Sequence, residues 1–189
     1  MIYFREKLLQ RLNGASKVVF MGIGEEKLRD DGVGPYIITE LLDLNSSRFK
    51  FINAYVDPMS RIDEIIEFNP SHLVIIDTCT LNKDPGTVAI IERDDMEEMV
   101  PISSHVIPVH IVVDLLMEKI PSLDAFMIGF VPESMNGFDS LTFYKEGELT
   151  LDDLNENIDL PLFEFNLTDT VKRAADKIIE IIKEILKSI

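Results

Sequence analysis

Two neighbouring carboxylates, Asp30 and Asp31, follow an apolar run and a glycine turn, just before a segment with helical periodicity. A third carboxylate, Asp77, ends another apolar run, and His105 follows a pair of serines. Carboxylate oxygens and an imidazole nitrogen together suit a divalent metal ion that keeps open coordination positions. We therefore hypothesise a metal site formed by Asp31, Asp77 and His105.

Five apolar runs predict the strands that must position these side chains, and the segments between them are mostly helical in pattern. The runs cover residues 17–23, 49–56, 72–78, 87–92 and 125–131. This alternation is typical of an α/β protein, and we expect a three-layer αβα sandwich with a mostly parallel central sheet of about five strands. Ligands of such sheets bind beyond the carboxyl ends of the strands. Asp31 follows one strand there, Asp77 ends another, and His105 can reach the same rim from a loop.

The length of 189 residues predicts one domain that spans residues 1–189. Residues 1–14 have helical spacing and form an extra amino-terminal helix ahead of the first strand. A long helix that ends near Leu186 is expected at the other end, capped by Thr168 or Asp169. Residues 136–166 carry glycine, proline and many acidic side chains without clear periodicity, which indicates a surface excursion.

The composition excludes several classes of function. With 34 acidic and 18 basic residues, the formal net charge is −16, which disfavours binding to nucleic acid. The absence of a long apolar run and of a secretory signal pattern predicts no membrane insertion and a cytoplasmic location. The single cysteine, Cys79, cannot form a disulfide within the chain and is in keeping with a reducing compartment. The sequence leaves the oligomeric state open.

Each candidate residue also has a simpler explanation. Gly22 and Gly24 could form a dinucleotide-binding turn, but Lys27 stands where that fingerprint needs a third glycine, and nearby carboxylates repel phosphate. An aspartate at a helix start can cap the helix, and we assign this role to Asp30 and metal binding to Asp31. Asp77 could simply accept hydrogen bonds in a turn with the residue that follows it.

Two further alternatives concern the thiol and the other histidines. Cys79 could act as a nucleophile with His105 as its base, although a free cysteine is more often a buried apolar residue. His72 lies at the start of a predicted strand, and His110, within a helical segment, is interpreted as a packing or surface residue. The chain has neither a serine hydrolase elbow nor a zinc peptidase helix motif.

Several motifs together resemble those of the hydrogenase maturation endopeptidases. They are Gly22-Ile23-Gly24 with Asp30-Asp31-Gly32-Val33-Gly34-Pro35, Val74-Ile75-Ile76-Asp77, Asp84-Pro85-Gly86-Thr87, Ser103-Ser104-His105 and Gly129-Phe130-Val131-Pro132-Glu133-Ser134. The resemblance runs over most of residues 17–142 and again over 167–188. Within the family, the chain is most similar to enzymes that serve hydrogenases of the formate-hydrogenlyase type. It departs from the family pattern at Glu25, where asparagine is usual, and in the Asn53–Met59 loop.

The resemblance implies both an activity and a set of functional residues. It implies an endopeptidase that removes the carboxyl-terminal extension of the nickel-iron hydrogenase large-subunit precursor after nickel insertion. Asp31, Asp77 and His105 match the family's catalytic and metal-binding positions, with nickel carried by the precursor as the bound metal. A non-cleaving, nickel-sensing assembly chaperone for the same precursor is the alternative, because it would use the same ligands.

Overall fold

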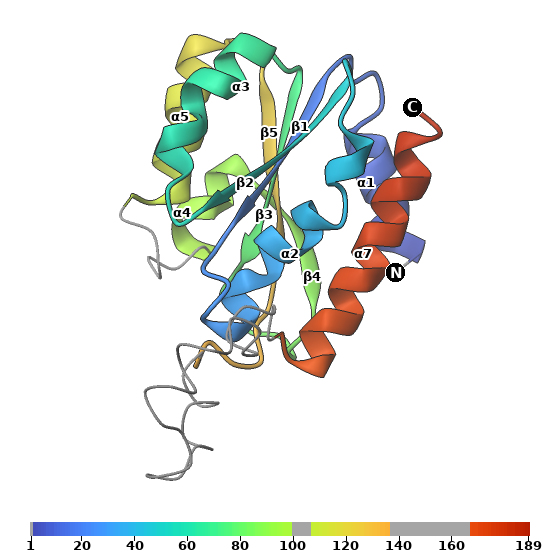
Figure 1. The fold of residues 1–189 in the computed structure, drawn as a ribbon, viewed down its shortest axis with the longest axis vertical. Coiled ribbons are helices and arrows are strands. Elements are labelled where there is room, and N and C mark those ends of the chain that lie inside the picture. Colours follow the sequence, from blue (N-terminus) through green and yellow to red (C-terminus); the bar gives the residue numbers. More distant parts are fainter. Residues whose placement is uncertain (1, 100–106, 137–166) are drawn as a thin grey trace, which may run out of the picture.

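The structure is a computed structural model that describes residues 2–99, 107–136 and 167–189 (Figure 1). Within these ranges, five strands form one sheet in the order β2-β1-β3-β5-β4. The strands are β1 (Val18–Ile23), β2 (Phe49–Tyr55), β3 (His72–Thr78), β4 (Val88–Glu92) and β5 (Asp124–Phe130). The neighbours β2, β1, β3 and β5 are parallel, whereas β4 runs antiparallel to β5 at the edge. The mostly parallel five-stranded sheet expected from the sequence is confirmed.

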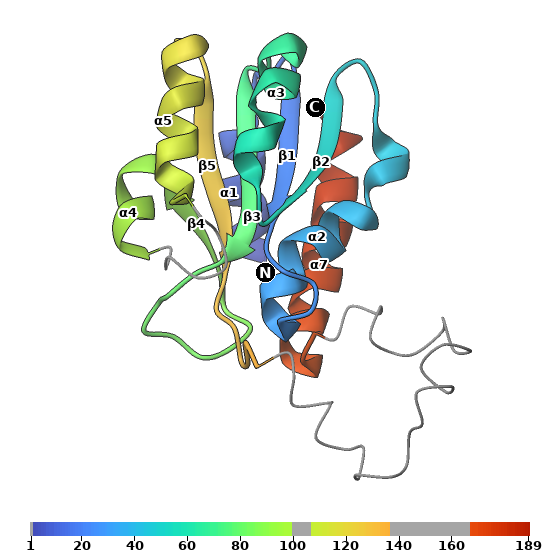
Figure 2. The same ribbon diagram turned by 60° about the vertical axis from the view of Figure 1, so that its left-hand side comes forward.

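Helices cover both faces of the sheet, which completes the three-layer sandwich (Figures 1 and 2). One face carries α1 (Ile2–Arg11), α2 (Val33–Thr39) and α7 (Asp169–Leu186), and the other carries α3 (Ile62–Phe68), α4 (Met96–Met99) and α5 (Val109–Lys119). Short 3-10 turns precede several of these helices; the turn Arg29–Gly32 leads into α2. Thr168 caps α7 by accepting a hydrogen bond from the Val171 N–H at 3.4 Å, as expected for one of the two predicted caps.

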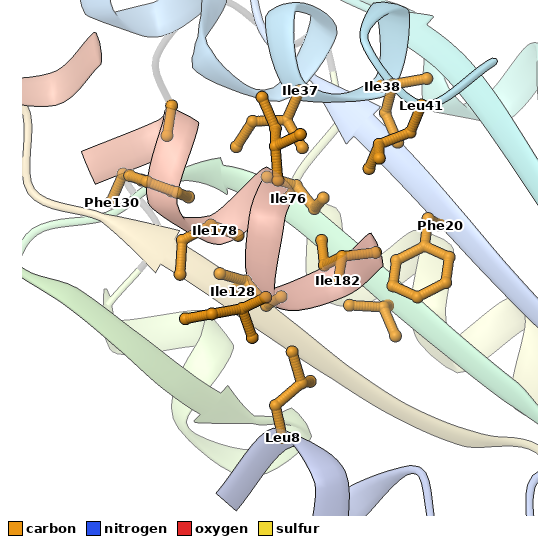
Figure 3. Close-up of a cluster of buried hydrophobic side chains, with 14 of the residues drawn as sticks. Leu8, Phe20, Ile37, Ile38, Leu41, Ile76, Ile128, Phe130, Ile178 and Ile182 are labelled. Atoms are coloured by element: carbon orange, nitrogen blue, oxygen red, sulfur yellow. The ribbon is translucent and has the colours of Figure 1, made fainter. Parts of the chain in front are cut away.

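The core consists of one cluster of apolar side chains on each face of the sheet. All residues of β1 are buried, as are all but the first residue of β3, because both strands are covered by helices on both sides. Figure 3 shows the cluster beneath α2 and α7, where Ile178 and Ile182 meet Ile128 and Phe20 from the sheet. This packing holds the central strands rigidly, so the residues at their carboxyl ends have a fixed base.

The amino-terminal helix α1 contributes to the same core cluster. Leu8 and Leu12 are fully buried beside α7 and the sheet. Arg11 donates a hydrogen bond of 2.7 Å to Asp124 at the start of β5 and lies 4.5 Å from the centre of the Phe126 ring. These contacts fasten α1 near the amino ends of the strands, away from the rim where the candidate residues lie.

None of the helices within the described residues is both long enough and apolar enough to cross a membrane.

Candidate active site

The site lies at the carboxyl ends of β1 and β3, where the loop after β1 passes into the 3-10 turn Arg29–Gly32 and then into α2 (Figure 2). The turn brings Asp30 and Asp31 against the end of β3, which carries Asp77. All three carboxylates are buried, with at most 1 % of each residue exposed. The strand ends therefore gather acidic groups at this rim, as the sequence predicts.

Glycines permit the close approach of these segments. Gly24 has φ of +132°, and a Cβ atom there would lie 1.8 Å from the carbonyl oxygen of Asp31. A Cβ at Gly34 would lie 2.3 Å from the Ile76 carbonyl oxygen, and one at Gly22 would lie 2.5 Å from that of Gly34. Side chains at these positions would push α2 away from β1 and β3. The packing accounts for the glycines without a bound nucleotide.

Asp31 and Asp77 lie close together, on either side of the Thr78 hydroxyl. Thr78 Oγ1 is 3.5 Å from Asp31 Oδ1 and 3.4 Å from Asp77 Oδ1. The separation of the two carboxylate oxygens therefore cannot exceed the sum of these distances. Asp31 Oδ2 also accepts a hydrogen bond of 2.8 Å from the Glu25 N–H. Asp77 Oδ1 accepts one of 2.6 Å from the Thr78 N–H. Asp77 thus accepts the hydrogen bond expected in a turn with Thr78, and it also lies close to Asp31.

Acidic side chains outnumber basic ones in the loop after β1, where Lys27 and Arg29 are the basic residues. Besides the buried pair, Glu25 and Glu26 follow Gly24 in the loop after β1. Burial, and then the neighbouring charge of Glu25, raise the pKa of Glu26. Carboxylates concentrated in this way favour a positively charged group at the rim, such as a divalent cation.

Asp30 connects three distant parts of the chain. Its Oδ2 accepts hydrogen bonds from the N–H groups of Glu133 and Ser134, at 2.8 and 2.9 Å, and its Oδ1 accepts one from the Thr168 N–H at 2.7 Å. The Thr168 hydroxyl also donates to Oδ2 at 3.0 Å. The predicted capping of the following helix is wrong, because Gly32 is the amino-terminal cap residue of α2 and no side chain caps it. Asp30 instead fixes the loop after β5 and the start of α7 to the rim.

Replacing Asp30 by asparagine should destabilise the fold by about 3 kcal/mol or more, because the new amide would face N–H donors with its own NH₂ group. Unfolding in urea, followed by circular dichroism, measures the change. Asp57→Asn is the matched control, since Asp57 accepts from the Ser60 N–H at an exposed turn and should cost less than about 1 kcal/mol. Equal stability of the two variants would contradict the structural role of Asp30.

His105 lies outside the described residues, so its place beside Asp31 and Asp77 stays a prediction. Among the described residues, no group of three or more histidine, cysteine, aspartate or glutamate side chains could hold a metal ion. His72 is at the amino end of β3, opposite the rim, 3.7 Å from Asp124. Burial lowers the pKa of His72. Residues 137–166, which make up nearly all of the predicted surface excursion, also lie outside the described residues.

Cys79 is a buried structural residue. It is 1 % exposed, and a Cβ on Gly129 would lie 2.8 Å from its sulfur. Burial, and then the charge of Asp77, raise the pKa of the thiol to about 12. The thiol is therefore protonated at neutral pH and is a poor nucleophile, in agreement with the preference for a packing role.

We expect the folded protein to react with iodoacetamide far more slowly than the urea-unfolded protein, because only the thiolate reacts and the folded state holds the thiol protonated and buried. Mass spectrometry of the alkylated chain measures the two rates. Cys79→Ala should retain proteolytic activity. Rapid labelling of the folded protein, together with inactivation, would instead indicate that Cys79 is a nucleophile.

Sequence reasoning missed two features of the site. Thr78, between the carboxylates, follows Asp77 directly, and a hydroxyl residue beside a buried strand-end aspartate is the signal that could have pointed to it. The binding of Glu133, Ser134 and Thr168 by Asp30 had no local signal, because those partners are more than 100 positions away.

Comparisons with known proteins agree with this architecture. The hydrogenase maturation protease family model (HycI) matches residues 35–148. A Methanocaldococcus jannaschii protein assigned to the hydrogenase maturation proteases is 33 % identical over 137 residues, which cover 68 % of this chain and 80 % of that one. The hydrogenase 3 maturation protease of Escherichia coli K12 is 27 % identical over 124 residues, or 66 % of this chain and 78 % of that one.

Among solved structures, the crystal structure of the HycI NiFe hydrogenase maturation protease from Thermococcus kodakarensis has the same fold. The TM-score is 0.73 at 24 % identity, with 96 % of this chain and 99 % of that one covered. Fold and relatives define a hydrolase of the α/β class that acts on peptide bonds. The chain belongs to the hydrogenase maturation protease family.

Proposed function

We propose that this endopeptidase removes the carboxyl-terminal extension of the nickel-iron hydrogenase large-subunit precursor after nickel has been inserted. The observation that carries the proposal is the convergence of Asp31 and Asp77 across Thr78, at the strand-end rim of a chain in this protease family. Two buried carboxylates at one rim provide oxygen ligands for a metal ion that the precursor also binds.

The nickel ion is part of the substrate in this scheme. Asp31, Asp77 and His105 occupy some of its coordination positions, and the precursor supplies the remaining ligands. A metal ion held in this way can polarise the scissile carbonyl or activate a water molecule. The residues of this chain orient the ion: the Glu25 N–H fixes one oxygen of Asp31, and the Thr78 N–H fixes one oxygen of Asp77. A precursor without nickel lacks the ion that joins it to the carboxylates, so only the nickel-loaded precursor is cleaved.

The HycI relatives favour a precursor of the formate-hydrogenlyase type within this family. We place the reaction in the cytoplasm, where a single free thiol such as Cys79 is compatible with the reducing conditions.

Intact-mass spectrometry of the precursor tests the proposal. Nickel-loaded and nickel-free precursor are each incubated with the enzyme, and only the loaded form should lose its carboxyl-terminal segment. A stable complex with an unshortened precursor would support the non-cleaving chaperone instead, which family membership disfavours. Equal shortening of both forms would refute the nickel requirement.

A further inference from the structure

Backbone strain is concentrated beside the site. Among the described residues, three that are not glycine have positive φ: Arg29 at 52°, Tyr55 at 50° and Asn69 at 52°. Asn69 is the carboxyl-terminal cap of α3, a position where asparagine adopts this conformation readily. Arg29 and Tyr55 have no such local explanation. Arg29 directly precedes Asp30 and Asp31, and Tyr55 ends β2 at the same rim.

The position of Tyr55 is determined by an irregularity in the sheet. The pairing of β1 with β2 shifts register after Gly22, so that Tyr55 and not Ala54 stands opposite Ile23. The Tyr55 carbonyl oxygen accepts a hydrogen bond of 3.0 Å from the Gly24 N–H. Gly24 in turn packs against the main chain of Asp31. Such irregularities in pairing re-aim side chains and are common next to active sites.

Burial of the Tyr55 side chain does not offset the cost of its left-handed backbone conformation. Tyr55 is 40 % exposed, whereas the other aromatic residues of β2, Phe49 and Phe51, pack into or against the core. A left-handed conformation costs a residue with a side chain about 1–2 kcal/mol, and glycine avoids this cost. Strain that packing does not explain is found most often at functional sites. Tyrosine is also one of the residues that contribute most to binding at protein interfaces.

We propose that Tyr55 is a substrate-contacting residue, which holds a segment of the precursor polypeptide across the rim next to Asp31. The inference rests on the proposed function, because the precursor is the substrate assumed. The side chain binds the polypeptide and takes no part in bond breaking, so its loss should appear in KM and leave kcat nearly unchanged.

Tyr55→Gly separates binding from folding, because a structural role and a substrate-binding role predict opposite changes in stability. Glycine relieves the backbone strain, so the melting temperature should rise by about 2–4 °C. It also removes the ring, so the KM for the nickel-loaded precursor should rise roughly tenfold or more. Tyr55→Phe keeps the ring and should stay within about threefold of the wild-type KM. Asn69→Gly, at a left-handed position away from the rim, is the matched control and should leave KM unchanged.

Each outcome bears on the proposal. A wild-type KM in Tyr55→Gly would overturn the contact. A lower melting temperature would also overturn the proposal, because it would show that the tyrosine serves the fold. If the wild-type enzyme fails to cleave the loaded precursor, the proposed function is wrong. Binding of the precursor to wild type and Tyr55→Gly, measured by titration calorimetry, then still decides whether Tyr55 touches it.

Discussion

Asparagine at position 31 or at position 77 should lower kcat/KM for cleavage of the nickel-loaded precursor by at least about a hundredfold. The substitution keeps the size of the side chain but removes the negative charge that would ligate the metal ion. Folding should persist, because the amide oxygen can still accept the hydrogen bond from the Glu25 N–H at position 31 or from the Thr78 N–H at position 77.

The measurement is a time course of precursor shortening, with thermal unfolding of each variant as the test of folding. Asp176→Asn is the control for a carboxylate away from the rim, since Asp176 accepts a hydrogen bond of 2.7 Å from the Tyr36 hydroxyl between α2 and α7. It should cleave as the wild type does. Wild-type rates in both Asp31→Asn and Asp77→Asn would eliminate the carboxylate pair as the active site.

The strands of this fold are predictable because their apolar runs are local. The predicted strand 72–78 matches β3 (His72–Thr78), and 125–131 differs from β5 (Asp124–Phe130) by one residue at each end. The same pattern placed Asp77 at a strand end, and hence at the rim. The direction of β4 could not be foreseen, because an apolar alternation has the same form in either direction.

The parts of the site that sequence reasoning missed depend on tertiary contacts. Asp30 has the residue type of a helix cap, but the donors that reach it come from the loop after β5 and the start of α7. Tyr55 adopts its left-handed conformation at the register shift between β1 and β2, and the local sequence contains no signal for that shift. Local propensity describes the elements, whereas these features arise only when the elements pack.

Gly34→Ala tests whether close packing of α2 on the sheet holds the site together. Alanine is the better helix former by about 1 kcal/mol, so propensity alone predicts a gain in stability. The new Cβ, however, would lie 2.3 Å from the Ile76 carbonyl oxygen and 2.4 Å from that of Ile23. Both are main-chain atoms of central strands and cannot move aside as a flexible side chain could. We expect a loss of about 3 kcal/mol or more in the free energy of unfolding.

Urea denaturation measures this loss, and Gly14→Ala provides the contrast. Gly14 has φ of +82°, but a Cβ there would meet no described atom within 4 Å, so only the backbone cost of about 1–2 kcal/mol applies. A Gly34→Ala variant as stable as the wild type would mean that α2 can withdraw freely from β1 and β3. If α2 does withdraw in the folded fraction, it carries Asp31 away from Asp77, so cleavage by that fraction should fall as well. Activity per folded molecule therefore distinguishes a displaced site from a protein that is merely less stable.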